Sequence, residues 1–175
     1  MTRRFRRMAP RWGGWNSIRS REPAKKTTIP WRSLKPAYWD ISALVPSCAQ
    51  QKASSNLYRL LGRYEIVTWW GTPVEIRSSL ERLVRMGQLT ATECSDGETR
   101  LKRLRRTWRE VLPDDGLRSE AESLLHRFPL SATDALQLAA ATTWTGGRSQ
   151  GKIFICGDAR LLEAARQVGF QGIEP

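Results

Sequence analysis

The chain has few of the residues that nucleophilic and zinc-dependent mechanisms commonly use. It contains one histidine, His126, and three cysteines that are far apart, with no CxxC pair. A single histidine excludes a ribonuclease mechanism built on paired histidines, and the cysteine spacing argues against a zinc site. Scattered cysteines of this kind are typical of a protein in a reducing cytoplasm. Hydrolytic chemistry in this chain would therefore have to use carboxylates and a metal ion.

Long hydrophobic runs are also missing. No apolar stretch approaches the roughly 20 residues that span a membrane. The basic N-terminus lacks the apolar segment of a secretion signal. The sequence therefore predicts a soluble, cytoplasmic protein with no membrane partner, and its 175 residues fit one folded domain.

Positive charge is concentrated at the N-terminus. The net charge is +12, and residues 1–37 hold eleven Lys and Arg against one acid, Glu22. Residues 1–36 are rich in Arg, Pro, Gly and Ser and have no helix or strand periodicity, so they are predicted to be a disordered extension. Tryptophans among its bases would also suit contact with single-stranded nucleic acid, whereas a translation start just before Ala37 would remove the extension altogether. The folded domain is expected over residues 37–175.

Apolar runs alternate with helical patterns from residue 37 onward. The pattern predicts strands over residues 37–39, 65–70, 152–156 and 170–173, and a short one over 111–113. Helices are expected between Asp40 and Pro46, over residues 53–64, from residue 73 through Val84, and over 92–111, 117–128, 131–144 and 158–168. This order predicts an α/β fold with a parallel sheet.

Four acids occur where strands meet helices. Asp40, Glu75 and Asp158 each follow a strand, and Asp134 lies at the third position of a helix that starts on the same side of the sheet. Each acid also has a local explanation. Asp40 and Asp158 suit helix N-caps, Glu75 completes a capping box with Thr72 as the N-cap, and an acid at the position of Asp134 favours the helix dipole.

The four positions together indicate more than capping. In a right-handed α/β fold they converge on the carboxyl edge of the sheet, where ligands bind. Clustered carboxylates repel one another unless a cation neutralises them, and oxygen ligands suit Mg²⁺ or Mn²⁺. A metal held in this way can activate water for attack on a phosphodiester. The pattern therefore favours nuclease chemistry.

Four motifs resemble a known family. The segments YWDISALV, TWWGTPVE, FPLSATDALQLAAA and FICGDARLLEAARQVGF resemble the PIN domain, and within it the VapC-type toxins of bacterial toxin–antitoxin systems. The resemblance covers residues 37–175. It implies a three-layer α/β/α sandwich with a mainly parallel sheet and a Mg²⁺- or Mn²⁺-dependent endoribonuclease activity. It also implies an RNA substrate, a cognate antitoxin protein, and a homodimer that would use the apolar helix faces between Ala53 and Met86.

The resemblance also assigns roles to residues. Asp40 and Asp134 match the most constant metal ligands, Glu75 and Asp158 match the other two catalytic acids, and Ser42 matches a hydroxyl residue that orders the site. Two positions depart from the family pattern: Ser131 stands where such toxins often have Arg, and Gly157 stands where a polar residue commonly precedes the fourth acid.

Other functions remain compatible with the sequence. A PIN nuclease of RNA processing would have no antitoxin. A catalytically weak or inactive RNA-binding protein could use the basic arm and the bases of residues 100–109, although a solvated helix face explains these bases more simply. A receiver-type signalling module would need a pair of acids after an early strand and a lysine after the last strand, and Asp40 stands alone.

Overall fold

The computed structural model describes residues 34–49 and 54–175. The predicted disordered extension falls almost entirely on residues 1–33, outside the described residues, and so does Ala53, the expected start of the second helix. The described elements run from β1, which begins at Lys35, to β5, which ends at Ile173.

Five strands of the described region form one parallel sheet. The strands are β1 (Lys35–Trp39), β2 (Tyr64–Trp69), β3 (Arg109–Val111), β4 (Ile153–Ile155) and β5 (Gln171–Ile173). Their order across the sheet is β3-β2-β1-β4-β5, and every pairing is parallel. The predicted α/β fold with a parallel sheet is therefore confirmed.

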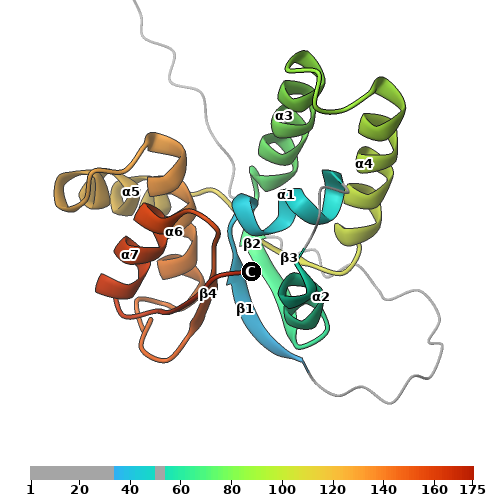
Figure 1. Ribbon diagram of the computed structural model, residues 1–175. Helices are drawn as coiled ribbons and strands as arrows, with labels where there is room; N and C mark the ends of the chain where they lie inside the picture. Colours follow the sequence, from blue (N-terminus) through green and yellow to red (C-terminus); the bar gives the residue numbers. More distant parts are fainter. Residues whose placement is uncertain (1–33, 50–53) are drawn as a thin grey trace, which may run out of the picture. The chain divides into compact units, whose positions relative to one another are not determined.

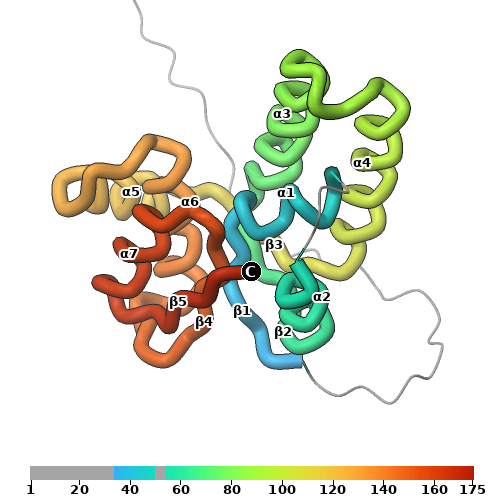
Figure 2. The backbone as a smooth tube through the Cα atoms, in the orientation of Figure 1, coloured from blue at the N-terminus to red at the C-terminus, as the bar shows by residue number. Residues whose placement is uncertain are grey.

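Helices cover both faces of this sheet. Figure 1 shows α1 to α4 on one face and α5 to α7 on the other, so the fold is a three-layer α/β/α sandwich. The helices are α1 (Ile41–Ala49), α2 (Ser55–Leu61), α3 (Thr72–Arg85), α4 (Ala91–Leu104), α5 (Asp115–Arg127), α6 (Ala132–Trp144) and α7 (Ala159–Gln167). Figure 2 follows the chain from β4 through α7 into β5, which lies beside β4.

The core is divided between the two faces by the alternation of side chains along each strand. In β1, Ala37 and Trp39 pack against the α1–α4 side, whereas Tyr38 packs against the α5–α7 side. Helix α6 carries a run of fully buried small residues, Ala139 to Ala141, which lets it lie close to the sheet as its sequence predicts. Because β1 is the central strand, the residue that follows it, Asp40, lies between the two helical layers.

Two helices differ from the prediction. Pro46 was expected to end the first helix, but α1 continues through it to Ala49. A proline inside a helix costs about 3 kcal/mol, and the full burial of Leu44 and Cys48 in the core offsets that cost. The helix expected over residues 92–111 ends at Leu104, because residues Arg109–Val111 pair with Val67–Trp69 of β2 instead. Trp108, inside the expected helix, is instead buried directly before β3.

The order in which successive strands are added to the sheet reverses at its centre. From β1 the chain moves outward through β2 and β3, then returns across the sheet to place β4 on the other side of β1. The carboxyl ends of β1 and β4 thus flank the point where ligands bind in open α/β sheets. Among the described residues, no helix combines the length and apolarity needed to cross a bilayer.

Candidate active site

Asp40 lies directly after β1, at the switch point of the sheet. Its backbone N–H donates to the Ile155 carbonyl (3.0 Å), which extends the pairing of β1 with β4 by one residue. The residue is only 3% exposed. Its Oδ2 atom accepts hydrogen bonds from the backbone N–H of Ser42 (2.9 Å) and from the Ser42 hydroxyl. Asp40 therefore caps α1, as one interpretation of the sequence held, and its Oδ1 atom remains outside these bonds.

The hydroxyl of Ser42 connects two segments that are far apart in the sequence. It donates to Asp40 Oδ2 and accepts from the backbone N–H of Gly157 at 2.7 Å. A Cβ atom at Gly157 would lie 3.4 Å from this hydroxyl, at the near limit of ordinary contact. The loop after β4 is thereby fastened to the start of α1, beside the Asp40 carboxylate.

Glu75 does not have the capping role expected of it. The N-cap of α3 is Gly71 and makes no side-chain capping bond, so the predicted capping box with Thr72 is wrong. The Thr72 hydroxyl lies 2.8 Å from the Thr68 hydroxyl inside the core. The two oxygens of Glu75 instead accept from the indole of Trp69 (2.9 Å) and the amide of Gln137 (2.7 Å). These tertiary contacts outcompete the local box because they satisfy polar groups that burial removes from water.

A buried chain of hydrogen bonds orients Glu75. The Tyr38 hydroxyl donates to Gln137 Oε1 at 2.8 Å, which fixes the amide so that Nε2 donates to Glu75 Oε2. Burial, followed by the charges of Asp40 and Glu75, raises the pKa of the Tyr38 hydroxyl. Tyr38 therefore remains a proton donor at neutral pH, and the carboxylate keeps a defined orientation.

Asp134 occupies the third position of α6, as the sequence predicts. Its backbone N–H donates to the Ser131 hydroxyl (3.2 Å), and its Oδ2 atom accepts from the Ser131 backbone N–H (3.4 Å), which is a complete capping box; Oδ2 also accepts from the Ser131 hydroxyl (2.8 Å). Ser131, a departure from the family pattern, thus has a structural role as N-cap. Gln137 lies three residues further on, one turn along the same helix face, and binds Glu75.

Asp158 is the N-cap of α7. Its Oδ1 atom accepts from the backbone N–H groups of Arg160 (2.9 Å) and Leu161 (3.0 Å). The thiol of Cys156 lies between this residue and the first acid, 3.4 Å from the Asp158 carbonyl and 3.6 Å from Asp40 Oδ2. The structure thus joins Asp158 to Asp40 through Cys156.

The acids influence one another electrostatically. Burial raises the pKa of the Asp40 carboxyl, against the hydrogen bonds from Ser42. Burial also raises the pKa of Glu75, and the negative charges of Asp40 and Asp134 add to this rise. Among the described residues, none of the four acids forms an ion pair. Carboxylates that are buried and unpaired in this way disfavour their own charged state.

The donor chemistry suits a hard divalent cation. Asp40, Asp134 and Asp158 each use one oxygen in local hydrogen bonds and keep the other outside them. Within the described part of the chain, however, no three His, Cys, Asp or Glu side chains lie close enough together to hold an ion. Mg²⁺ commonly uses only one or two carboxylates and keeps several waters. The described side chains therefore form no closed cage, and their free carboxylate oxygens are of the kind that an open site with one or two protein ligands uses.

Sequence reasoning missed several side chains that support the acids. Tyr38, Trp69, Gln137 and Cys156 contact Asp40 or Glu75, directly or through one residue. Gln137 could have been noticed, because it is the one strongly polar residue in the apolar run ALQLAAA and falls one turn after Asp134. The indole bond of Trp69 left no signal in the sequence, since Trp69 reads as an ordinary residue of a buried strand.

No protein-family model matches the sequence, and no curated protein sequence is significantly similar to it. The functional interpretation therefore depends on the parallel sheet and on the carboxylates at its edge.

Because burial raises the pKa of Asp40, replacing this residue by the neutral asparagine should change the stability of the fold. An acid whose pKa is higher in the folded state stabilises the fold below its unfolded pKa, near 3.8, and this contribution is lost as the pH rises through the folded value. We therefore expect Asp40→Asn to melt at a higher temperature than the parent at pH 7 in EDTA, and the difference to shrink toward pH 4. Thermal melts followed by circular dichroism across this range measure it. A difference that stays constant with pH would contradict the assignment.

Proposed function

We propose that the chain is a metal-dependent endoribonuclease of the VapC type, the toxin of a toxin–antitoxin pair. The observation that carries the proposal is the set of unpaired acids at the switch point of a parallel sheet, led by the buried Asp40. Burying a carboxylate without an ion-pair partner costs stability, and a buried carboxylate of this kind at a sheet edge is a candidate for a role that needs its charge. A cation-dependent reaction supplies that role.

The residues divide into ligands and supports. Asp40 and Asp134 would hold Mg²⁺ or Mn²⁺, with Glu75 and Asp158 as the other two acids of the site. When bound, such a cation lowers the pKa of water and offsets the charge of a phosphodiester. Ser42 and Cys156 hold the Asp40 carboxylate in place, and Gln137 and Trp69 do the same for Glu75. Supports of this kind set the direction of a ligand's free oxygen.

The proposal includes two protein partners and a cellular location. A cognate antitoxin would cover the acidic edge and prevent RNA from reaching it. A homodimer is supported by large apolar side chains that remain exposed within residues 53–86, among them Tyr58 (61% exposed) and Met86 (59%). The predicted cytoplasmic location follows from an RNA substrate and from three free cysteines.

Cleavage of total cellular RNA by the purified full chain tests the proposal. We expect cutting with Mg²⁺ or Mn²⁺, none with EDTA, and strong loss of cutting in Asp134→Asn with RNA binding retained. Asp96→Asn is the matched control, because Asp96 is an exposed acid of α4 and its replacement changes the charge equally. If the folded, metal-loaded parent does not cut, and its RNA binding is unchanged in Asp134→Asn and falls steeply with salt, the chain is instead an RNA-binding protein.

A further inference from the structure

A cavity of about 750 Å³ opens at the amino edge of the sheet, at the opposite ends of the strands from the acids. It exists because β1 and β4 pair over only part of their length. β1 pairs with β2 from Lys35 onward, whereas its pairing with β4 is confined to Tyr38 and Trp39. The first residues of β1 therefore have no strand on the β4 side. The lining residues are Leu34, Lys35, Gly62, Arg63, Tyr64, Gly151, Ile153 and Gln171.

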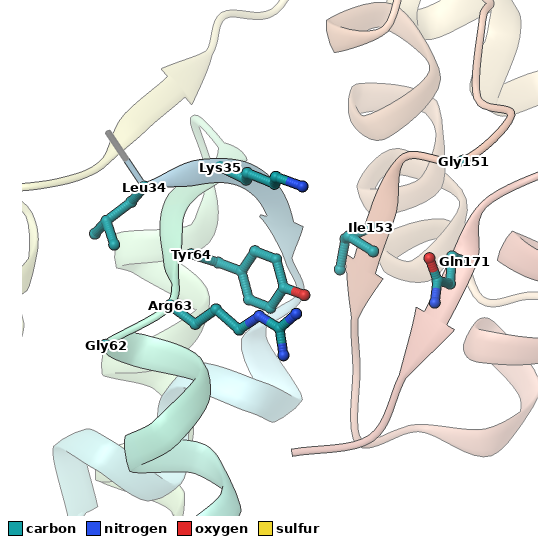
Figure 3. Close-up of a pocket in the computed structure, with 8 residues that line it drawn as sticks. All are labelled: Leu34, Lys35, Gly62, Arg63, Tyr64, Gly151, Ile153 and Gln171. Carbon is teal, nitrogen blue, oxygen red and sulfur yellow. The ribbon is translucent and has the colours of Figure 1, made fainter. Parts of the chain in front are cut away.

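Positive groups converge on this cavity. Figure 3 shows the Lys35 ammonium, the Arg63 guanidinium and the Tyr64 hydroxyl directed across the gap toward Ile153 and Gln171. None of the lining residues that the structure describes is acidic. Among the described residues, neither Lys35 nor Arg63 takes part in an ion pair, in contrast to Arg77, Arg105 and Arg109 elsewhere in the domain. Within the described ranges, the cavity thus holds two cations without an acidic partner.

The exposed side chain of Arg63 lies over the ring of its neighbour, Tyr64. Its guanidinium carbon lies 5.5 Å from the centre of the Tyr64 ring, within the range of a cation–π interaction, and Tyr64 itself is buried. A guanidinium held in this way loses less conformational entropy when its N–H groups bind an anion, and its planar donors match the oxygens of a phosphate. Gln171 adds an amide donor from the facing wall.

We propose that this cavity binds the phosphate group of a nucleotide, either free or as one unit of an RNA strand. Two cations, a phenol and an amide form a donor set for a phosphate. The volume lies within the roughly 300–1,000 Å³ of small-molecule sites, so the cavity also has room for a sugar or base against Leu34 and Ile153. The site is separate from the acidic edge, and its occupation requires no catalysis. It would let the domain hold RNA at both ends of its strands.

Binding measurements on the full chain in EDTA test this site. The probes are a nucleoside monophosphate, the matching nucleoside, inorganic phosphate and a short single-stranded RNA, each followed by titration calorimetry. We expect the monophosphate to bind and the nucleoside to fail. The double variant Lys35→Ala/Arg63→Ala should weaken monophosphate binding at least tenfold. If inorganic phosphate binds with the same affinity as the monophosphate, the site recognises the phosphate group alone. If the RNA displaces the monophosphate, an RNA strand also supplies the phosphate that the site binds.

Two controls separate the cavity from general electrostatics. Arg82→Ala/Arg85→Ala removes the same charge from exposed positions of α3 and should change binding less than twofold. Gln171→Glu places a carboxylate on the wall that faces both cations and should weaken binding, whereas Gln88→Glu makes the same charge change away from the cavity and should not. Equal losses in the cavity and control variants, or no binding of any phosphate probe, would overturn the inference. Neither result bears on cleavage, which depends on the acids at the other edge.

Discussion

Replacing Asp40 by asparagine should lower the rate of RNA cleavage at least about 100-fold while the protein stays folded. Changes in residues that only orient a metal ligand typically cost 10–100-fold, and removing the charge of a ligand itself should cost more. Asparagine keeps the size of the side chain and an oxygen for the Ser42 N–H, so the cap of α1 survives. Single-turnover cleavage of a defined RNA at saturating Mg²⁺ measures the effect.

Ser42→Ala provides the graded comparison. It removes the hydroxyl that bonds both Asp40 and the Gly157 N–H but leaves every carboxylate present. We expect a loss within about 10–100-fold, with the apparent affinity for Mn²⁺ weakened in parallel. Asp96→Asn should cleave like the parent. A parent-like rate in Asp40→Asn would remove Asp40 from the site, and with it the proposed mechanism.

Gly71→Ala should have the largest effect on stability among single-methyl changes near the site. A Cβ atom at Gly71 would lie 2.3 Å from Nε1 of Trp69, closer than any real contact, although the backbone of Gly71 is ordinary (φ −73°). The indole must shift, and its hydrogen bond to Glu75 breaks. Overpacking of this kind costs typically 1–3 kcal/mol, which corresponds to a fall in Tm of about 2–12 °C for a domain of this size.

The same substitution at Gly62 is the control. Gly62 has a right-handed helical backbone (φ −80°), and an added Cβ would meet nothing closer than 3.6 Å. Gly62→Ala should therefore be neutral or stabilising by about 0.4–1 kcal/mol. We also expect Gly71→Ala to lose cleavage activity at temperatures where it remains folded, because Glu75 loses one of its two supports. Melting curves and cleavage assays at 20 °C separate the two effects. Equal melting temperatures in the two variants would show that the ring of Trp69 can yield.

Local patterns predicted most of the elements. The apolar runs of residues 37–39 and 65–70 became β1 and β2, and Asp158 is the helix N-cap that its position indicated. These features depend on residues close in the sequence, such as a carboxylate within reach of the next two or three N–H groups. Ile76, Leu80 and Leu83 of α3 are buried, as their helical spacing requires of a face that packs on the core.

Competition between local and tertiary contacts decided the rest. The Thr72–Glu75 capping box fits the local sequence well, but Trp69 and Gln137 offer Glu75 bonds in a buried setting. The sequence pattern predicts that the helix continues past Leu104. Residues Arg109–Val111 instead pair with the edge of β2 as strand β3. A window of ten residues misses the decisive partners, because Gln137 lies 62 residues after Glu75 and Arg109 pairs with Val67, 42 residues earlier; only Trp69, six residues before Glu75, is close in the sequence.

By itself, the sequence determined the α/β alternation, the helix faces, most caps and the placement of four acids where strands meet helices. These follow from periodicity and from short-range hydrogen bonding. Only the tertiary structure decided how the acids are supported: Asp40 buried beside Ser42 and Cys156, and Glu75 held by Trp69 and Gln137. It also opened the cavity between Lys35, Arg63 and Gln171. The register of β1 is the physical reason for the cavity, because β1 pairs with β2 from Lys35 onward but with β4 only at Tyr38 and Trp39.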